Sequence, residues 1–127
     1  MPLSFKERRR ILKNANYLEL TPFRICNEET DENGLVTILS PKFKNKFAVK
    51  YIAPRLRQQF FRIKLDELGS AVWKEIDGKR DVRQLASILQ ERFGERIAPV
   101  FERLPKYLTS LYLQDFISFN EIKKEGE

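Results

Sequence analysis

The side chains of this chain that could take part in chemistry are cations and carboxylates. Its 127 residues include 24 Lys and Arg and 18 Asp and Glu, but no His. Without His, the chain cannot supply a Ser-His-Asp triad, a Cys-His pair or a histidine-containing metal site. The single Cys26 cannot form an internal disulfide, which is typical of a protein in a reducing cytoplasm. We therefore predict a cytoplasmic protein with no metal and no other cofactor.

The carboxylates in the second half of the chain do not form a catalytic pattern. Helical spacing assigns a helix cap or an exposed helix face to each of four of them: Glu67, Glu75, Asp77 and Asp81. Nothing in the sequence indicates a pocket with convergent polar groups. We predict that the protein is not an enzyme and keep catalysis only as a third alternative.

Positive charge is concentrated in the first half of the chain. Residues 1–64 contain 14 Lys and Arg against 6 Asp and Glu, a net charge of +8, whereas residues 65–127 contain 10 against 12, a net charge of −2. Residues 42–58 interleave cations with aromatic and aliphatic side chains, a composition that can bind nucleic acid through phosphates and base stacking. The same composition suits a further strand at a sheet edge, where lysines discourage unwanted pairing.

Two helices joined by a tight turn are predicted between residues 65 and 94. Apolar residues recur every three or four positions in the first helix: Leu65, Leu68, Val72 and Ile76. Asp66 is its expected N-cap, and Gly78 lies where a residue that tolerates positive φ can end it. Asp81 with Gln84 forms a capping-box signature, so a second helix should begin directly afterwards. The residues that mark this second helix are Val82, Leu85, Ala86, Leu89, Phe93 and the terminating Gly94.

A third helix is predicted from about Ala98 to Gln114, with Pro99 in its first turn. Its buried stripe is expected to be Phe101, Leu104, Leu108 and Leu111. Pro105 lacks an N–H and clashes with the preceding turn, so we expect a kink or a split near Arg103.

Extended segments are predicted before and after the helices. The clearest strand is residues 60–65, FFRIKL, in which apolar and basic side chains alternate. The other segments are an extended entry at 17–22, a first strand at 23–25, an acidic turn at 27–34, a second strand at 36–39 ended by Ser40-Pro41, and a short terminal strand at 116–119.

This order of strands followed by helices predicts an α+β fold. We expect a winged-helix-like architecture, in which a small antiparallel β-sheet packs on three α-helices. The expected organisation is a basic N-terminal extension at 1–16, a domain at 17–119 and a frayed C-terminal tail at 120–127. Trp73 and the Asp77-Gly78 pair are interpreted as structural, as an aromatic anchor and a turn.

Two sequence segments resemble one known family. They are LDELGSAVWKEIDGKRDVRQLASILQERFG and VFERLPKYLTSLYLQDFISF, and the likeness extends over about residues 17–119. The chain resembles the PqqD-like proteins, also called RiPP recognition elements, which are not enzymes. The resemblance implies a chaperone that binds the leader of a ribosomally made precursor peptide and presents it to a modifying enzyme, commonly a radical S-adenosylmethionine protein.

The resemblance also implies a binding site. The leader would add as an extra strand to FFRIKL by β-augmentation, pairing with the backbone of Phe61, Arg62, Ile63 and Lys64. A helical wall would be formed by Val100, Arg103, Leu104 and Tyr107. Each of these residues has an ordinary alternative as core or solvated surface, and for Leu104 the core is favoured. Arg62 and Lys64 could attract an acidic leader or serve only solubility.

Two features depart from the compact family pattern. The basic segments 1–16 and 42–58 are additional, and a strand formed by the second of them could cover or relocate the receptive edge. Pro105 disturbs the helix that should form the wall. Both features bear on the site more than on the fold.

The main rival hypothesis is a winged-helix DNA-binding regulator, because a helical pair beside a sheet is common in repressors. The net charge of −2 in the helical half disfavours phosphate contacts by the helices, so nucleic acid is not the predicted partner. A membrane is not a predicted partner either, because no apolar run approaches the roughly 18 residues of a membrane span.

Overall fold

The computed structural model describes residues 6–7, 16–42, 50 and 60–122. The further strand expected within 42–58 and most of the expected terminal extension and tail lie outside these residues. The chain divides into two compact units, one containing residues 1–25 and 71–127 and the other residues 26–70. The boundary between the units falls within helix α3 (Glu67–Glu75).

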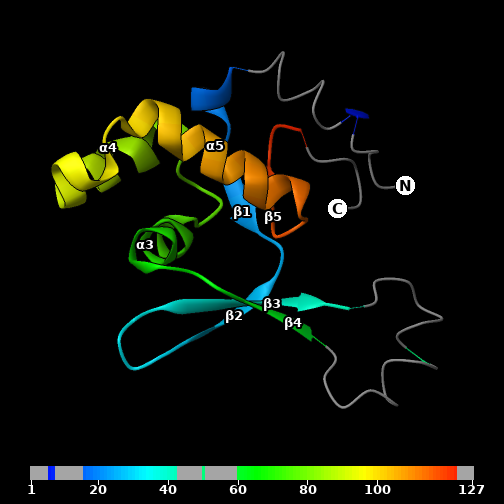
Figure 1. Ribbon diagram of the computed structural model, residues 1–127. Coiled ribbons are helices and arrows are strands. Elements are labelled where there is room, and N and C mark those ends of the chain that lie inside the picture. Colours follow the sequence, from blue (N-terminus) through cyan, green and yellow to red (C-terminus); the bar gives the residue numbers. More distant parts are fainter. Residues whose placement is uncertain (1–5, 8–15, 43–49, 51–59, 123–127) are drawn as a thin grey trace. The chain divides into compact units, whose positions relative to one another are not determined.

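The unit of residues 26–70 contains a three-stranded antiparallel sheet (Figure 1). Its strands are β2 (Asn27–Thr30), β3 (Val36–Pro41) and β4 (Phe60–Lys64), in the order β2-β3-β4. The register places Thr37 between Glu29 and Lys64, and pairs Leu39 with Arg62. Val36 and Ile38 of the central strand are buried, whereas β4 is mostly exposed.

The expected acidic turn at 27–34 is wrong in its first half, because residues 27–30 form β2. Asp31 confines the turn to the residues that follow: its Oδ1 accepts the backbone N–H groups of Asn33 and Leu35, both at 2.9 Å. Gly34 supplies the positive φ of 82° that closes the turn. The chain before Asp31 is thereby directed back along β3, where cross-strand pairing outweighs the low strand propensity of glutamate.

Strand β3 continues through Pro41, so the expected stop at Ser40-Pro41 is also wrong. Pro41 pairs with Phe60 on β4, while β2 begins only at Asn27, opposite Leu39. No β2 residue therefore requires an N–H from Pro41, and a proline is accommodated at such a position.

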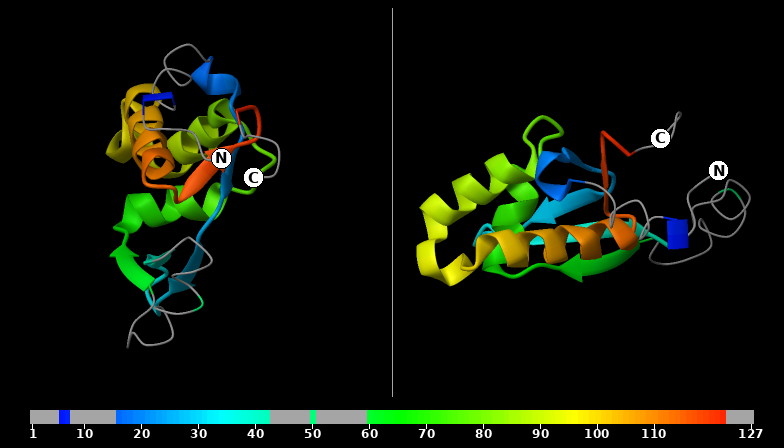
Figure 2. Two further views of the ribbon diagram at one scale, coloured as in Figure 1. Left: turned by 90° about the vertical axis from the view of Figure 1, so that its right-hand side faces the viewer. Right: turned by 90° about the horizontal axis from the view of Figure 1, so that it is seen from above.

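The second unit, residues 1–25 and 71–127, contains the helices α4 (Val82–Phe93) and α5 (Val100–Leu113). A two-stranded antiparallel ribbon joins distant parts of the sequence, because β1 (Pro22–Arg24) pairs with β5 (Ile117–Phe119) (Figure 2). Short 3-10 turns, η1 (Tyr17–Glu19) and η3 (Gly94–Ile97), complete the unit. The residues expected to be extended at 17–22 thus include a helical turn, while β1 and β5 confirm the first and terminal strands.

The predicted helix ends are confirmed where local capping determines them. The Asp66 carboxylate accepts the N–H of Gly69 at 2.7 Å, as an N-cap does. Asp81 and Gln84 form the reciprocal capping box, with distances of 2.8 and 2.9 Å. Gly94 ends α4 with a positive φ of 55°, as predicted. Gly78 has the expected positive φ of 77°, but α3 ends three residues earlier at Glu75, so the expectation that Gly78 ends this helix is wrong. The apolar stripe of α4 is buried as predicted over Val82, Leu85, Ala86 and Leu89.

Helix α5 differs from its prediction in two ways. It is continuous through Pro105, so the expected split is wrong. Pro105 cannot donate to the Phe101 carbonyl, but Phe101 lies on the exposed side of the helix, where water can serve as the donor. The Phe101 side chain is 51% exposed and is not part of the buried stripe. Val100 replaces it in the core, with Leu104, Leu108 and Leu111.

The described residues therefore form an α+β fold with three α-helices and small antiparallel sheets, compatible with a winged-helix-like description. The expected single sheet is instead two sheets, one of three strands and one of two. Trp73 is fully buried, in agreement with its interpretation as a packing anchor.

Candidate functional site

Strand β4 lies at the edge of its sheet and pairs with β3 on one side only, within the part of the chain that the structure describes (Figure 1). Two aromatic side chains stand exposed on this strand, Phe60 at 41% and Phe61 at 57%. Exposed apolar area beside unpaired backbone is a recurring mark of a strand that receives another chain.

The backbone of β4 divides its residues into two sets. The N–H of Leu65 donates to the Val36 carbonyl at 2.8 Å, just beyond the pair of Thr37 with Lys64. Hydrogen-bonded and non-hydrogen-bonded pairs alternate in an antiparallel ladder. The amides of Ile63 and Phe61 therefore point to β3, and those of Lys64 and Arg62 point to the open edge. Of the four residues predicted to pair with a leader, Arg62 and Lys64 therefore have backbone N–H and C=O groups that point away from β3.

The two cations of β4 differ in their surroundings. The guanidinium of Arg62 forms a two-pronged ion pair with Glu29 of β2: Nη2 contacts Oε2, and Nη1 lies 3.4 Å from Oε1. Hydrogen bonding by Glu29, together with its charge, raises the pKa of Arg62 above its ordinary value. For Lys64, the described residues provide no ion pair. The two cations that were expected to attract an acidic peptide therefore differ, because Arg62 is paired with Glu29 and Lys64 has no ion pair among the described residues.

The four residues predicted on α5 belong to the unit of residues 1–25 and 71–127. Val100 and Leu104 are 3% and 2% exposed and lie in the core, as favoured for Leu104. Arg103 is exposed, and its Nη1 donates to the Arg96 carbonyl at 2.8 Å. Tyr107 is half-buried. Arg103 and Tyr107 are the more accessible residues of this set, and contact of any of the four with a peptide stays a prediction.

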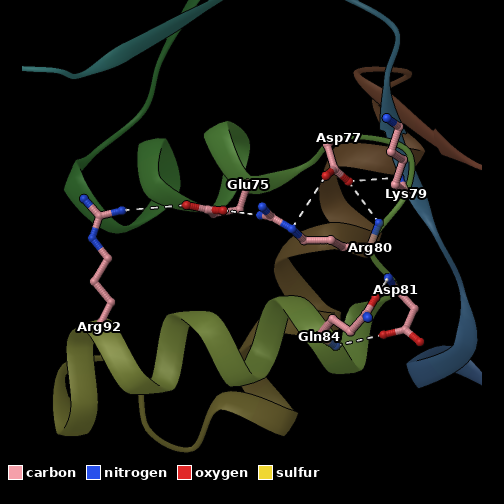
Figure 3. Close-up of polar contacts among 7 residues, drawn as sticks. All are labelled: Glu75, Asp77, Lys79, Arg80, Asp81, Gln84 and Arg92. Carbon is pink, nitrogen blue, oxygen red and sulfur yellow. Dashed lines mark hydrogen bonds and ion pairs between the residues drawn. The ribbon is translucent and has the colours of Figure 1, made fainter.

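The turn between α3 and α4 contains a cluster of polar contacts (Figure 3). Asp77 Oδ1 accepts the N–H groups of Arg80 and Lys79, both at 2.9 Å, and these bonds lower the pKa of the Asp77 carboxyl. Arg80 also pairs with Glu75, which lies 4.0 Å from Nη1 of Arg92. The charges satisfy one another, so the cluster serves to hold the turn.

Gly78 fixes this turn to the β1–β5 ribbon. Its N–H donates to the Pro22 carbonyl at 3.1 Å, and its own carbonyl accepts from Nδ2 of Asn120 at 2.9 Å. A Cβ at Gly78 would contact the Phe23 Cβ at 3.4 Å. The Asp77-Gly78 pair therefore has the structural role that the sequence indicated.

Sequence reasoning missed Glu29, which it assigned to a turn. The signal that could have found it is Asp31-Glu32-Asn33-Gly34, a run of turn-forming residues flanked by segments of matching length. Placing the turn there would have made residues 27–30 the partner of β3.

Residues 6–7, 16–42, 50 and 60–122 contain no group of three or more His, Cys, Asp and Glu that could hold a metal ion. None of their helices is long and apolar enough to cross a membrane.

Comparison with known proteins gives one family. The family model for Coenzyme PQQ synthesis protein D (PqqD) matches residues 61–117. The match begins within β4, continues through α3, α4 and α5, and ends at the first residue of β5. No curated protein matches the chain.

Proposed function

Because residues 61–117 belong to the PqqD family, we propose that this protein captures the leader of a ribosomally synthesised precursor peptide and presents it to a modifying enzyme of the radical S-adenosylmethionine type. Family membership supports a non-catalytic, peptide-binding partner in biosynthesis. The capture mode, the enzyme partner and a cytoplasmic location are the finer parts of the proposal. Residues 17–119 are proposed as the peptide-binding domain.

The observation that carries the proposal is the edge of β4 opposite β3, with which no other described strand pairs. A guest strand at this edge would pair with the outward N–H and C=O groups of Arg62 and Lys64. Each backbone hydrogen bond contributes about 0.5–1.5 kcal/mol net. Such pairing requires little of the guest's sequence, so side-chain contacts must supply the selectivity.

The exposed Phe60 and Phe61 would supply part of the side-chain contacts to the guest strand. Phe60 and Phe61 are neighbours in the strand, so their side chains point to opposite faces of the sheet. A guest strand beside them would bury apolar surface on both faces, at about 25 cal/mol for each Å² removed from water. Lys42 Nζ lies 5.4 Å from the centre of the Phe61 ring, so a cation borders this aromatic surface.

The test is a binding titration with fluorescein-labelled leader segments of candidate precursor peptides. Lys64→Pro is the informative variant, because it removes an N–H that points outward and leaves the β3–β4 ladder intact. Lys64→Ala is the matched control, since it removes the same charge and retains the N–H. Ile63→Pro is less useful because that N–H faces β3.

We expect Lys64→Pro to weaken leader binding about three- to tenfold more than Lys64→Ala does. Circular dichroism and the urea midpoint establish that each variant is folded. Equal affinities for the two folded variants would reject strand pairing at β4. Binding that depends only on salt concentration would favour nonspecific charge attraction instead.

A further inference from the structure

One face of the three-stranded sheet carries the buried Val36 and Ile38, and the opposite face is here called the outer face. A row of side chains on the outer face crosses all three strands. Lys64 lies opposite Thr37, and Thr37 lies opposite Glu29. The next row pairs Arg62 with Leu39. Arg62 and Lys64 are two residues apart, so both side chains point to this same face.

Glu29 lies in the row of Lys64 but is bound by Arg62 from the neighbouring row. The long, forked guanidinium spans the width of β3 and offers two N–H groups to the two carboxylate oxygens. An ammonium offers a single charged centre and has no such planar match. The geometry thus commits Glu29 to Arg62, and the charge of Arg62 is already balanced.

A guest strand at the β4 edge would place one residue directly opposite Lys64. Cross-strand neighbours point to the same face with Cβ atoms about 4.5–5.5 Å apart, so this guest side chain would meet the ammonium. A guest side chain opposite Arg62 would meet a guanidinium whose forked face is turned to Glu29.

We infer that Lys64, and not Arg62, selects a carboxylate in the guest strand, and that Glu29 determines this choice by neutralising Arg62. The inference rests on the proposed function and refines it. The ligand class is an extended peptide with Asp or Glu on its outer face at the position opposite Lys64. Glu29 acts here as a specificity-determining residue that contacts no part of the guest.

The probes are short synthetic strand peptides in which valine alternates with threonine. Each threonine position in turn carries Glu in one peptide and Gln in its partner, so the pair differs by one charge of nearly equal size. Fluorescence anisotropy gives the dissociation constant of every pair with the wild type, Lys64→Gln, Arg62→Gln and Glu29→Gln. Circular dichroism confirms the fold of each variant.

In the wild type, one peptide position should prefer Glu over Gln by about two- to fivefold. Lys64→Gln should abolish this preference, and Arg62→Gln should retain it. Glu29→Gln releases Arg62, so a preference for Glu should appear at a second position two residues away, and adding Arg62→Gln should remove it again.

Two outcomes overturn the inference in different ways. The assignment to Lys64 is rejected if Lys64→Gln and Arg62→Gln reduce the preference for Glu equally. It is also rejected if the peptides bind the wild type with no preference for Glu over Gln. In both cases strand capture stands. If no peptide binds the folded wild type at all, capture at β4 is rejected, and the charge selection with it.

Discussion

The hydroxyl of Ser70 accepts the backbone N–H of Val36 at 2.8 Å in a buried position. The same oxygen lies 3.4 Å from the Leu65 carbonyl, to which it donates. Val36 and Leu65 share one direct backbone bond, from the Leu65 N–H to the Val36 carbonyl, and the Ser70 hydroxyl takes the place of the second bond at the end of the β3–β4 ladder. It satisfies two backbone groups at the point where β4 passes into α3.

Replacing Ser70 by Ala should destabilise the protein by about 1–3 kcal/mol, because the buried N–H of Val36 loses its acceptor. Urea unfolding followed by circular dichroism measures this change. Ser87→Ala is the matched control, since the exposed Ser87 hydroxyl donates only to the Arg83 carbonyl within α4 and its loss should cost under about 0.5 kcal/mol. Equal effects would show that Ser70 contributes no more than a surface serine.

Disruption of the capping box should destabilise α4 measurably. Asp81→Ala removes the acceptor of the Gln84 N–H and should lower the free energy of unfolding by about 0.5–2 kcal/mol. Asp81→Asn keeps a side-chain oxygen at the cap and should recover most of this loss. Thermal unfolding of the two variants provides the measurement. A similar loss in Asn and Ala variants would assign the effect to charge.

The raised pKa of the Tyr17 hydroxyl predicts that the protein loses stability at alkaline pH. Burial raises the pKa of Tyr17 to about 12 from the ordinary 10.0, and the hydrogen bond with Thr109 at 3.0 Å offsets only part of this effect. The unfolded chain releases the proton first as pH rises. The contribution is therefore fully present below pH 10.0 and is lost progressively as pH rises towards 12, to a total of about 2–3 kcal/mol at most.

The measurement is urea unfolding at several pH values across this interval, with Tyr17→Phe for comparison. The phenylalanine variant loses the Thr109 hydrogen bond at every pH, but its stability should fall less steeply above pH 10.0. Parallel curves for the two proteins would mean that other groups cause the alkaline loss.

Phe61 should matter more for peptide binding than for stability. Phe61 is 57% exposed, so Phe61→Thr removes little buried area, and threonine, which is β-branched, also suits a strand. Leader affinity should fall by up to about fivefold, the value of an aromatic cross-strand contact. Phe101→Thr on α5 is the control, because Phe101 is similarly exposed at 51%. An equal loss in both variants would argue against a specific role for the edge strand.

Local signals in the sequence were sufficient to locate the described helices α3, α4 and α5 and every described strand except β2. The capping box at Asp81 and Gln84 and the positive φ of Gly94 depend on neighbouring residues alone, so the limits of α4 could be predicted closely. The alternation of FFRIKL likewise identified β4. The resemblance of residues around these elements also led to the family that the comparison supports.

The tertiary structure alone decided which strands pair and which side chains meet. Three of the four residues of β2, Asn27, Glu28 and Glu29, have low strand propensity, and the strand forms because the turn at Asp31 aligns it with β3. Phe101 is exposed and its neighbour Val100 is buried because of how α5 is rotated about its own axis. Helical spacing alone does not decide which of these two adjacent apolar residues faces the core. Glu29 and Arg62 are 33 residues apart in sequence and meet only across β3. Such contacts depend on register between distant segments, and periodicity within one segment carries no information about it.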